Sequence, residues 1–156
     1  MPVTIARESP TTPDGHALIA GSDAALREFF PAHEIFSLDP SELAVPEARF
    51  FVARQAGVAI GCVALLACDG YAEVKRLYVS AAGRGKGNAR ALMARLEAEA
   101  LADGFILIRL ETGPALHPAV ALYQSLGYQT CARFGAYEDI PASLFMAKTL
   151  TRQAAE

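Results

Sequence analysis

Apolar residues along this chain fall into short blocks whose spacing changes from one block to the next. Between positions 49 and 79 they form three runs of the kind typical of strands. Gln55-Ala56-Gly57 and then Asp69-Gly70 separate these runs, and such residues favour tight turns. In the third run Leu77 and Val79 share one face, because strand side chains alternate. The pattern predicts an antiparallel meander after an opening strand; the expected strands are 3–7, 49–53, 58–67 and 72–79.

The clearest helical pattern covers residues 85–102. Its apolar residues recur at intervals of three and four and so form one stripe along a helix; they are Ala89, Leu92, Met93, Leu96 and Ala100. Gly104 is the expected C-terminal stop. The nearly continuous apolar run over 105–110 is typical of a strand buried on both faces. This strand–helix–strand order predicts one parallel crossover.

Weaker helix signals precede the meander. A helix is expected to begin near Ser22, a residue type that caps helices well, and to run toward Phe30, where a proline interrupts it. A second, short helical or irregular piece is expected over 33–43. Ser37 or Asp39 could cap it, because both side chains accept hydrogen bonds from helix amides.

The C-terminal part adds one helix and two strands. Pro118 suits the first turn of that helix and Gly127 its end. Strands are expected over 128–132 and 143–149. Together these elements predict a mixed α/β sheet. With no internal repeat or linker in the sequence, residues 1–156 are predicted to form a single domain.

Composition and charge narrow the class of protein. Hydrophobic residues make up 53% and charged residues 20%, which argues against disorder. The net charge is −3 and no segment is dominated by Lys or Arg, so nucleic-acid binding is not expected. No apolar targeting segment is seen, and the apolar run over 58–68 is too short to span a bilayer. Cys62, Cys68 and Cys131 form no C-x-x-C pair, which favours a reducing, cytoplasmic setting.

Residues 84–90, Arg-Gly-Lys-Gly-Asn-Ala-Arg, join the meander to the central helix. Amides at a helix N-terminus bind anions well, and glycine lets the backbone approach a phosphate closely. Arg84, Lys86 and Arg90 add positive charge. The segment does not match a P-loop, since no Ser or Thr follows Lys86, and it lacks the third glycine of a dinucleotide-binding fingerprint. It nevertheless predicts a phosphate or pyrophosphate site.

A third pattern, Arg84-x-x-Gly87-x-Ala89, resembles the pyrophosphate loop of the GCN5-related N-acetyltransferases, the GNAT superfamily. Further segments resemble that family in the same order; they are 73–79, 110–113, 119–123 and 126–128. The tail over 133–146 resembles a bacterial subgroup whose substrates are poorly defined. The resemblance covers most of the chain. It implies the GNAT fold, a largely antiparallel central sheet with one parallel βαβ crossover, flanked by about four helices.

The resemblance also implies acetyl-CoA as cosubstrate, without a metal. Backbone groups of Leu77 and Val79 are expected to bind its pantetheine arm like an added strand, and the loop is expected to bind its pyrophosphate. The expected cofactor-binding residues are Leu77, Val79, Arg84, Gly85, Lys86, Gly87, Asn88, Ala89 and Arg90. Many members carry Asn where this chain has Leu116, so that pantetheine contact is not carried over.

Acetyl transfer to an amine needs a proton for the leaving thiolate and a neutral nucleophile. Tyr123 is the candidate general acid, because a phenol with a pKa near 10 stays protonated at neutral pH; the alternative is a tyrosine that packs on the sheet. Glu73 is the candidate general base, acting through water, with Glu111 as the second candidate. Either could instead be a strand carboxylate without a catalytic role. For Glu73, that alternative includes pairing with Lys75 or Arg76.

His33, Glu34 and Tyr137 are candidates for the acceptor pocket, and His117 for a helix cap. The sequence predicts an acetyl-CoA-dependent N-acetyltransferase that acts by direct transfer on a primary amine, with a small molecule preferred as acceptor. The alternatives are acetylation of a protein N-terminus or lysine, and an acetyl-CoA-binding regulatory module without turnover. Neither nucleic acid nor membrane is expected as a partner, and the prediction leaves room for a homodimer.

Overall fold

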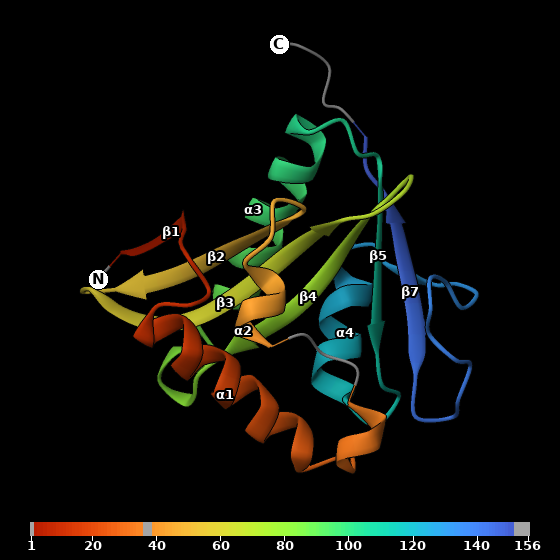
Figure 1. Ribbon diagram of the computed structural model, residues 1–156, viewed down its shortest axis with the longest axis horizontal. Coiled ribbons are helices and arrows are strands. Elements are labelled where there is room, and N and C mark those ends of the chain that lie inside the picture. Colours follow the sequence, from red (N-terminus) through yellow and green to blue (C-terminus); the bar gives the residue numbers. More distant parts are fainter. Residues whose placement is uncertain (1, 36–38, 152–156) are drawn as a thin grey trace.

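A computed structural model describes residues 2–35 and 39–151, which form one seven-stranded sheet covered by helices on both faces (Figure 1). The sheet order is β1-β2-β3-β4-β5-β7-β6. The strands are β1 (Val3–Arg7), β2 (Ala48–Gln55), β3 (Val58–Ala67), β4 (Ala72–Val79), β5 (Leu107–Thr112), β6 (Gln129–Thr130) and β7 (Leu144–Thr149). The helices are α1 (Pro13–Arg27), α2 (Pro40–Leu43), α3 (Asn88–Ala102) and α4 (His117–Ser125), with 3-10 turns η1 (Ala32–Glu34) and η2 (Ala81–Gly83).

The predicted meander and crossover are confirmed. β2 pairs with β3, and β3 with β4, both antiparallel. The β2–β3 turn contains Ala56 and Gly57 at positive φ, 53° and 79°, as a tight hairpin turn requires. β4 and β5 are parallel and are connected through α3, so the mixed sheet predicted from the sequence is the one observed.

The first helix differs from its prediction. It begins at Pro13 rather than near Ser22, and it ends at Arg27. Thr12 caps it, because its hydroxyl accepts a hydrogen bond from the Gly15 amide at 3.0 Å. Proline suits the first helical position, where its missing N–H would have no partner in any case. Pro13 taken alone would favour a loop. With Thr12 before it as the cap, it begins a helix instead.

The short helix α2 confirms one of two predicted caps. The Asp39 carboxylate accepts a bond from the Glu42 amide at 3.0 Å, and the Glu42 side chain accepts one from the Asp39 amide at 3.2 Å, which makes a capping box. Ser37 lies outside the described residues. At α4 the prediction is wrong: Leu116, not His117, occupies the N-cap position, and no side chain caps that helix.

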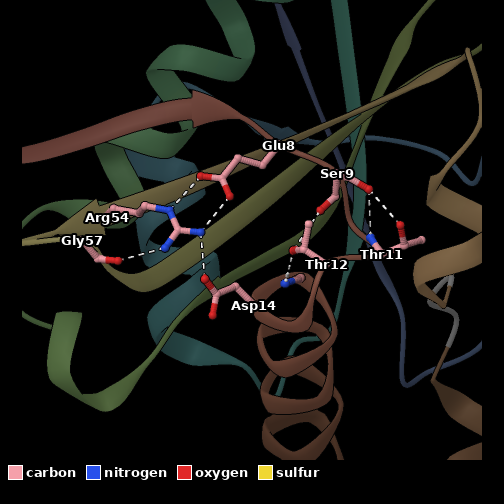
Figure 2. A network of polar contacts seen from close by, with 8 residues as sticks. Glu8, Ser9, Thr11, Thr12, Asp14, Arg54 and Gly57 are labelled. Atoms are coloured by element: carbon pink, nitrogen blue, oxygen red, sulfur yellow. Dashed lines mark hydrogen bonds and ion pairs between the residues drawn. The ribbon is translucent and has the colours of Figure 1, made fainter.

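A polar network joins the start of α1 to the β2–β3 hairpin (Figure 2). The Arg54 guanidinium donates two hydrogen bonds to the Glu8 carboxylate, both at 2.8 Å. It donates a third to Asp14 at 2.8 Å and a fourth to the Gly57 carbonyl at 2.9 Å. Two-pronged pairing of this kind holds both partners in a fixed orientation. The network therefore fixes α1 against the sheet at its first turn.

Each face of the sheet buries its own core. α3 and α4 cover one face, where Leu92, Met93 and Leu96 are fully buried. α1 and α2 cover the other face, with Ile19 and Leu43 2% exposed. Burying a side chain of this size contributes about 1.5–3 kcal/mol. The central strands β3 and β4 are thus held from both sides, which gives the neighbouring site a rigid floor.

Candidate active site

β4 and β5 pair only at one end of their length. Ala72 lies opposite Ile108 and Glu73 opposite Arg109, and beyond these pairs the strands spread apart (Figure 1). Arg76 interrupts the regular path of β4 with a φ of 56°, which is uncommon for a residue other than glycine. In the described part of the chain, β4 has no strand beside its β5-facing edge after these two pairs.

Helix α1 holds this irregular part of β4 in place. The Arg76 side chain is 3% exposed and donates a hydrogen bond to Asp23 at 2.6 Å. It also donates to the Ser22 hydroxyl at 3.4 Å, so the serine predicted to cap α1 instead binds β4 from the helix interior. Gly21 lies against Tyr78, where an added Cβ would come within 2.8 Å of the phenol oxygen. The close approach of α1 therefore shapes one wall of the site.

A cavity of about 260 Å³ occupies the opening between β4 and β5. Its walls come from the end of α1 with η1, from β4, from the end of β5, from α4 and from the segment before β7. The predicted site residues that line it are Leu77, Glu111, Tyr123, Glu34 and Tyr137. Glu73, Val79 and His33 do not line it. The fold thus brings together residues that lie more than a hundred positions apart in the chain.

Tyr123 projects from α4 into this cavity and is 7% exposed. Its ring packs edge-on against Tyr128, with 5.8 Å between ring centroids. Burial, and then the nearby Glu111 carboxylate, raise the pKa of the Tyr123 phenol above its usual value. The hydroxyl makes no hydrogen bond to another described residue. Tyr123 is part of the core, as the packing alternative predicted. A protonated phenol at the cavity wall is suited to donate a proton, and the role of Tyr123 as general acid stays a prediction.

Glu73 is 5% exposed and has two close partners. The Tyr137 hydroxyl donates to its carboxylate at 2.5 Å, and the Lys75 ammonium lies 3.0 Å from the same oxygen. Lys75 also contacts the Tyr137 hydroxyl. Burial and then Glu73 raise the pKa of Tyr137, which keeps that phenol protonated. The ion pair with Lys75 considered from the sequence is present, and the role of Glu73 as a base stays a prediction.

Glu111 ends β5 on the cavity wall. The Ser143 hydroxyl donates a hydrogen bond to it at 2.9 Å. Burial raises the pKa of the Glu111 carboxyl to about 7, because the charged form loses water there. A carboxyl with a pKa near the working pH can accept a proton and release it again. Ser143 carries no motif that would have identified it in the sequence.

The glycine loop adopts the backbone that its sequence predicts. Gly85 and Gly87 have positive φ values of 75° and 78°, and Gly87 is the N-cap residue of α3. No side chain caps this helix. The Asn88 amide group instead turns inward and donates to the Gly83 carbonyl at 2.8 Å. Lys86 donates to the Ala82 carbonyl at 3.2 Å, which folds its side chain back on the preceding turn.

This loop fits a pyrophosphate group. The first amides of a helix have no intrahelical acceptor, and here no side chain supplies one. A Cβ added at Gly85 or Gly87 would meet no atom within 4 Å, so the space above the loop is open. The exposed Arg84 side chain donates a hydrogen bond from its guanidinium to the Val79 carbonyl at 3.1 Å. Open amides and positive charge together are the features that a bound pyrophosphate needs.

Comparison with known proteins identifies the class. Residues 17–128 match the Acetyltransferase (GNAT) family, and the chain therefore belongs to the GNAT superfamily and is an acetyltransferase. It is 42% identical to a protein of Azospirillum brasilense named IAA acetyltransferase, over 95% of this chain and 98% of that protein.

Solved structures share the fold. An acyl-CoA N-acyltransferase from Klebsiella pneumoniae has a TM-score of 0.81 at 35% identity, over 96% of this chain and 98% of that one. A GNAT acetyltransferase from Elizabethkingia anophelis, solved with acetyl-CoA bound, has a TM-score of 0.71 at 16% identity, over 95% of this chain and 98% of that one. The second similarity shows the fold alone.

The structure also adds residues that the sequence did not single out. Phe29 and Phe30 line the cavity at the end of α1, with ring centroids 6.5 Å apart. Two aromatic residues directly before a proline were the signal available for them. Among the described helices, none is both long and apolar enough to cross a bilayer.

Proposed function

We propose that this acetyltransferase uses acetyl-CoA to acetylate the primary amine of a small molecule by direct transfer. One observation carries the proposal: a cavity of about 260 Å³ lies in the β4–β5 opening with a phenol, Tyr123, and a carboxyl, Glu111, on its walls. The two proton movements of this reaction need a proton donor and a proton acceptor at one site.

The chain supplies the binding of acetyl-CoA mainly through its backbone. We assign the pantetheine arm to the free edge of β4 at Leu77 and Val79, where no strand pairs on the β5 side. The amides of residues 85–90 hold the pyrophosphate, with Arg84, Lys86 and Arg90 adding positive charge. Fixing the thioester at one end of the cavity makes attack by a bound amine effectively intramolecular.

Tyr123 supplies the proton for the leaving group. The amine nitrogen forms a bond to the acetyl carbon, the carbon–sulfur bond breaks, and the sulfur takes the electron pair and the proton of the phenol. Its raised pKa ensures that Tyr123 holds this proton at neutral pH. The bound ammonium first gives one proton to a carboxylate, and the second proton, which the nitrogen loses as the amide forms, restores the phenol. Atoms and charge then balance over the cycle.

Two carboxylates are candidates to receive the amine proton. Glu111 faces the cavity, and its pKa of about 7 suits proton exchange near neutral pH. Glu73 lies behind Tyr137 and reaches the cavity through that hydroxyl. The geometry favours Glu111 as the group next to the substrate and Glu73 as the residue that orders Tyr137 and Lys75.

The acceptor end of the cavity favours a small acceptor over a peptide. The Phe30 ring lies against Gly113, where an added Cβ would be 2.5 Å from it. The end of α1 and the loop after β5 therefore meet, and Tyr137 and Ala142 line the same end. A peptide acceptor would have to enter past these contacts.

The test is acetyl-CoA-dependent thiol release across amines, amino acids, polyamines and peptides, with mass spectrometry of the acetylated product. Turnover of small amines in preference to peptides is expected. A preference for peptide N-termini or lysines would replace the proposed acceptor class. Binding of acetyl-CoA without acceptor-dependent release by any compound would make the protein a binding module instead.

A further inference from the structure

The charged groups on the cavity wall are arranged unevenly. Both cations already have a partner: Lys75 lies 3.0 Å from the Glu73 carboxylate, and Arg76 lies 2.6 Å from Asp23. The two carboxylates that line the cavity, Glu34 and Glu111, form no ion pair with any described residue. A ligand in this cavity therefore meets two carboxyl groups without an ion-pair partner and, among the described lining residues, no cation without one.

The rest of the acceptor end is apolar. The side chains of Leu26, Phe29, Phe30 and Ile35 line it on the side of α1 and η1. Phe29 is 53% exposed, which is unusual for so large an apolar side chain and marks the entrance. Glu34 stands between these residues in the chain and is half buried. An uncharged, apolar part of the acceptor gains binding free energy by contact with these walls. A charged group would lose its hydration there.

We propose that the acceptor is a primary amine on an uncharged apolar body, aromatic by preference, and that a carboxylate on the acceptor is rejected. This inference rests on the proposed function and specifies its substrate class. The ammonium group is drawn toward Glu34 and Glu111 before it loses its proton. An α-carboxylate would lie next to the same two groups with no cation to bind it, so free amino acids are excluded even where their side chain fits.

Binding and turnover test the inference separately. Calorimetry of the full chain with coenzyme A measures the affinity of phenethylamine, L-phenylalanine, hydrocinnamate and putrescine. Phenethylamine is expected to bind on the order of 100-fold more tightly than phenylalanine, because like charges at a desolvated site repel strongly. Hydrocinnamate and putrescine are expected to bind weakly. Equal or tighter binding of either carboxylate compound, or of putrescine, would overturn the inference.

Variants of Glu34 locate the effect. Glu34→Gln should weaken phenethylamine binding about threefold, as expected for a partly exposed charge. Glu34→Lys should reverse the preference toward hydrocinnamate, a gain that loss of folding cannot imitate. Glu28→Gln, which removes an exposed carboxylate six residues earlier in the chain, is the matched control and should change neither affinity. Unchanged selectivity in Glu34→Lys would contradict the proposal.

Thiol release with the same compounds then separates the two proposals. Selective binding of phenethylamine without its acetylation would leave the specificity standing and refute the proposed function. Acetylation of phenylalanine as fast as phenethylamine would leave the function standing and refute the specificity. Acetylation of phenethylamine alone, with the Glu34→Lys reversal, would support both.

Discussion

The two ends of the site are built in opposite ways. The proposed pyrophosphate end is one continuous segment, residues 84–90, and what it offers a ligand is backbone amides and glycine conformations. The acceptor end is assembled from side chains of α1, η1, β5 and the segment before β7. A backbone site depends on a few positions that must be glycine. A side-chain site depends on the packing of the whole fold, and single substitutions can alter what it selects.

Substitution of Tyr123 should have the largest effect on turnover. Tyr123→Phe removes the proposed proton donor but keeps the ring that packs on Tyr128. Turnover should fall on the order of 10², the low end for positioned proton transfer, with acetyl-CoA affinity and melting temperature unchanged. Steady-state kinetics and calorimetry measure both. An unchanged kcat would mean that this tyrosine serves packing alone.

The backbone end can be broken by one side chain. Gly87→Val forces a β-branched residue to a φ of 78° and places its methyl groups in the open space above the loop. Acetyl-CoA affinity should fall roughly 10- to 100-fold by calorimetry.

Gly57 provides a matched control for this variant. It has a φ of 79° and equally open surroundings, but it lies in the β2–β3 turn. Gly57→Val should lose comparable stability and keep full affinity for acetyl-CoA. If both variants lost affinity alike, the effect would be one of folding, and the loop would not be the pyrophosphate site.

The acceptor end should respond to pH through Glu111. If this carboxyl accepts the amine proton, kcat/KM should fall about tenfold for each pH unit below its pKa of about 7. Glu111→Gln should lower the rate near neutral pH and recover at high pH, where solvent deprotonates the amine. The pH profile of Glu73→Gln tests the other candidate. A Glu111→Gln profile that overlays wild type would move the role to Glu73 or to bulk water.

The same carboxyl should affect stability with a definite sign. Its pKa in the folded protein, about 7, lies above the ordinary 4.5. Between those pH values the native state holds a proton that the unfolded state has lost, so the free energy of unfolding falls as pH rises. Denaturant unfolding at several pH values should show that the free energy of unfolding depends less on pH in Glu111→Gln than in the wild type. A steeper dependence would mean that Glu111 is stabilised in its charged form.

The smallest effect is expected far from both ends of the site. Arg54→Met removes the hydrogen bonds that Arg54 makes to Glu8, Asp14 and Gly57 in Figure 2, while leaving an apolar side chain in place. Unfolding free energy should fall by about 1 kcal/mol, since the pairs are partly exposed. Arg27→Met, at the exposed end of α1, should have no measurable effect. A change in kcat/KM for Arg54→Met would show that the first turn of α1 influences the acceptor end.

The same contrast explains what could be predicted from sequence. The glycine loop, the meander and the crossover were predictable because their signals are local: turn residues, glycines and helix periodicity. The start of α1 was not, because its first-turn signal competes with the loop signal of two nearby prolines. For the acceptor end, the sequence predicted individual candidate residues but not how they are arranged. The pairing of Tyr137 with Glu73 joins residues 64 positions apart and leaves no local trace.

The short β4–β5 pairing also governs how the molecule transmits force and exchanges hydrogen. Backbone ladders unite β1 to β4 on one side and β5, β7 and β6 on the other, but among residues 2–35 and 39–151 two residue pairs alone connect these blocks within the sheet. If its pantetheine arm lies along β4 as proposed, acetyl-CoA adds a bridge where the ladder is missing. We then expect amide hydrogen exchange along β5 to slow when acetyl-CoA binds.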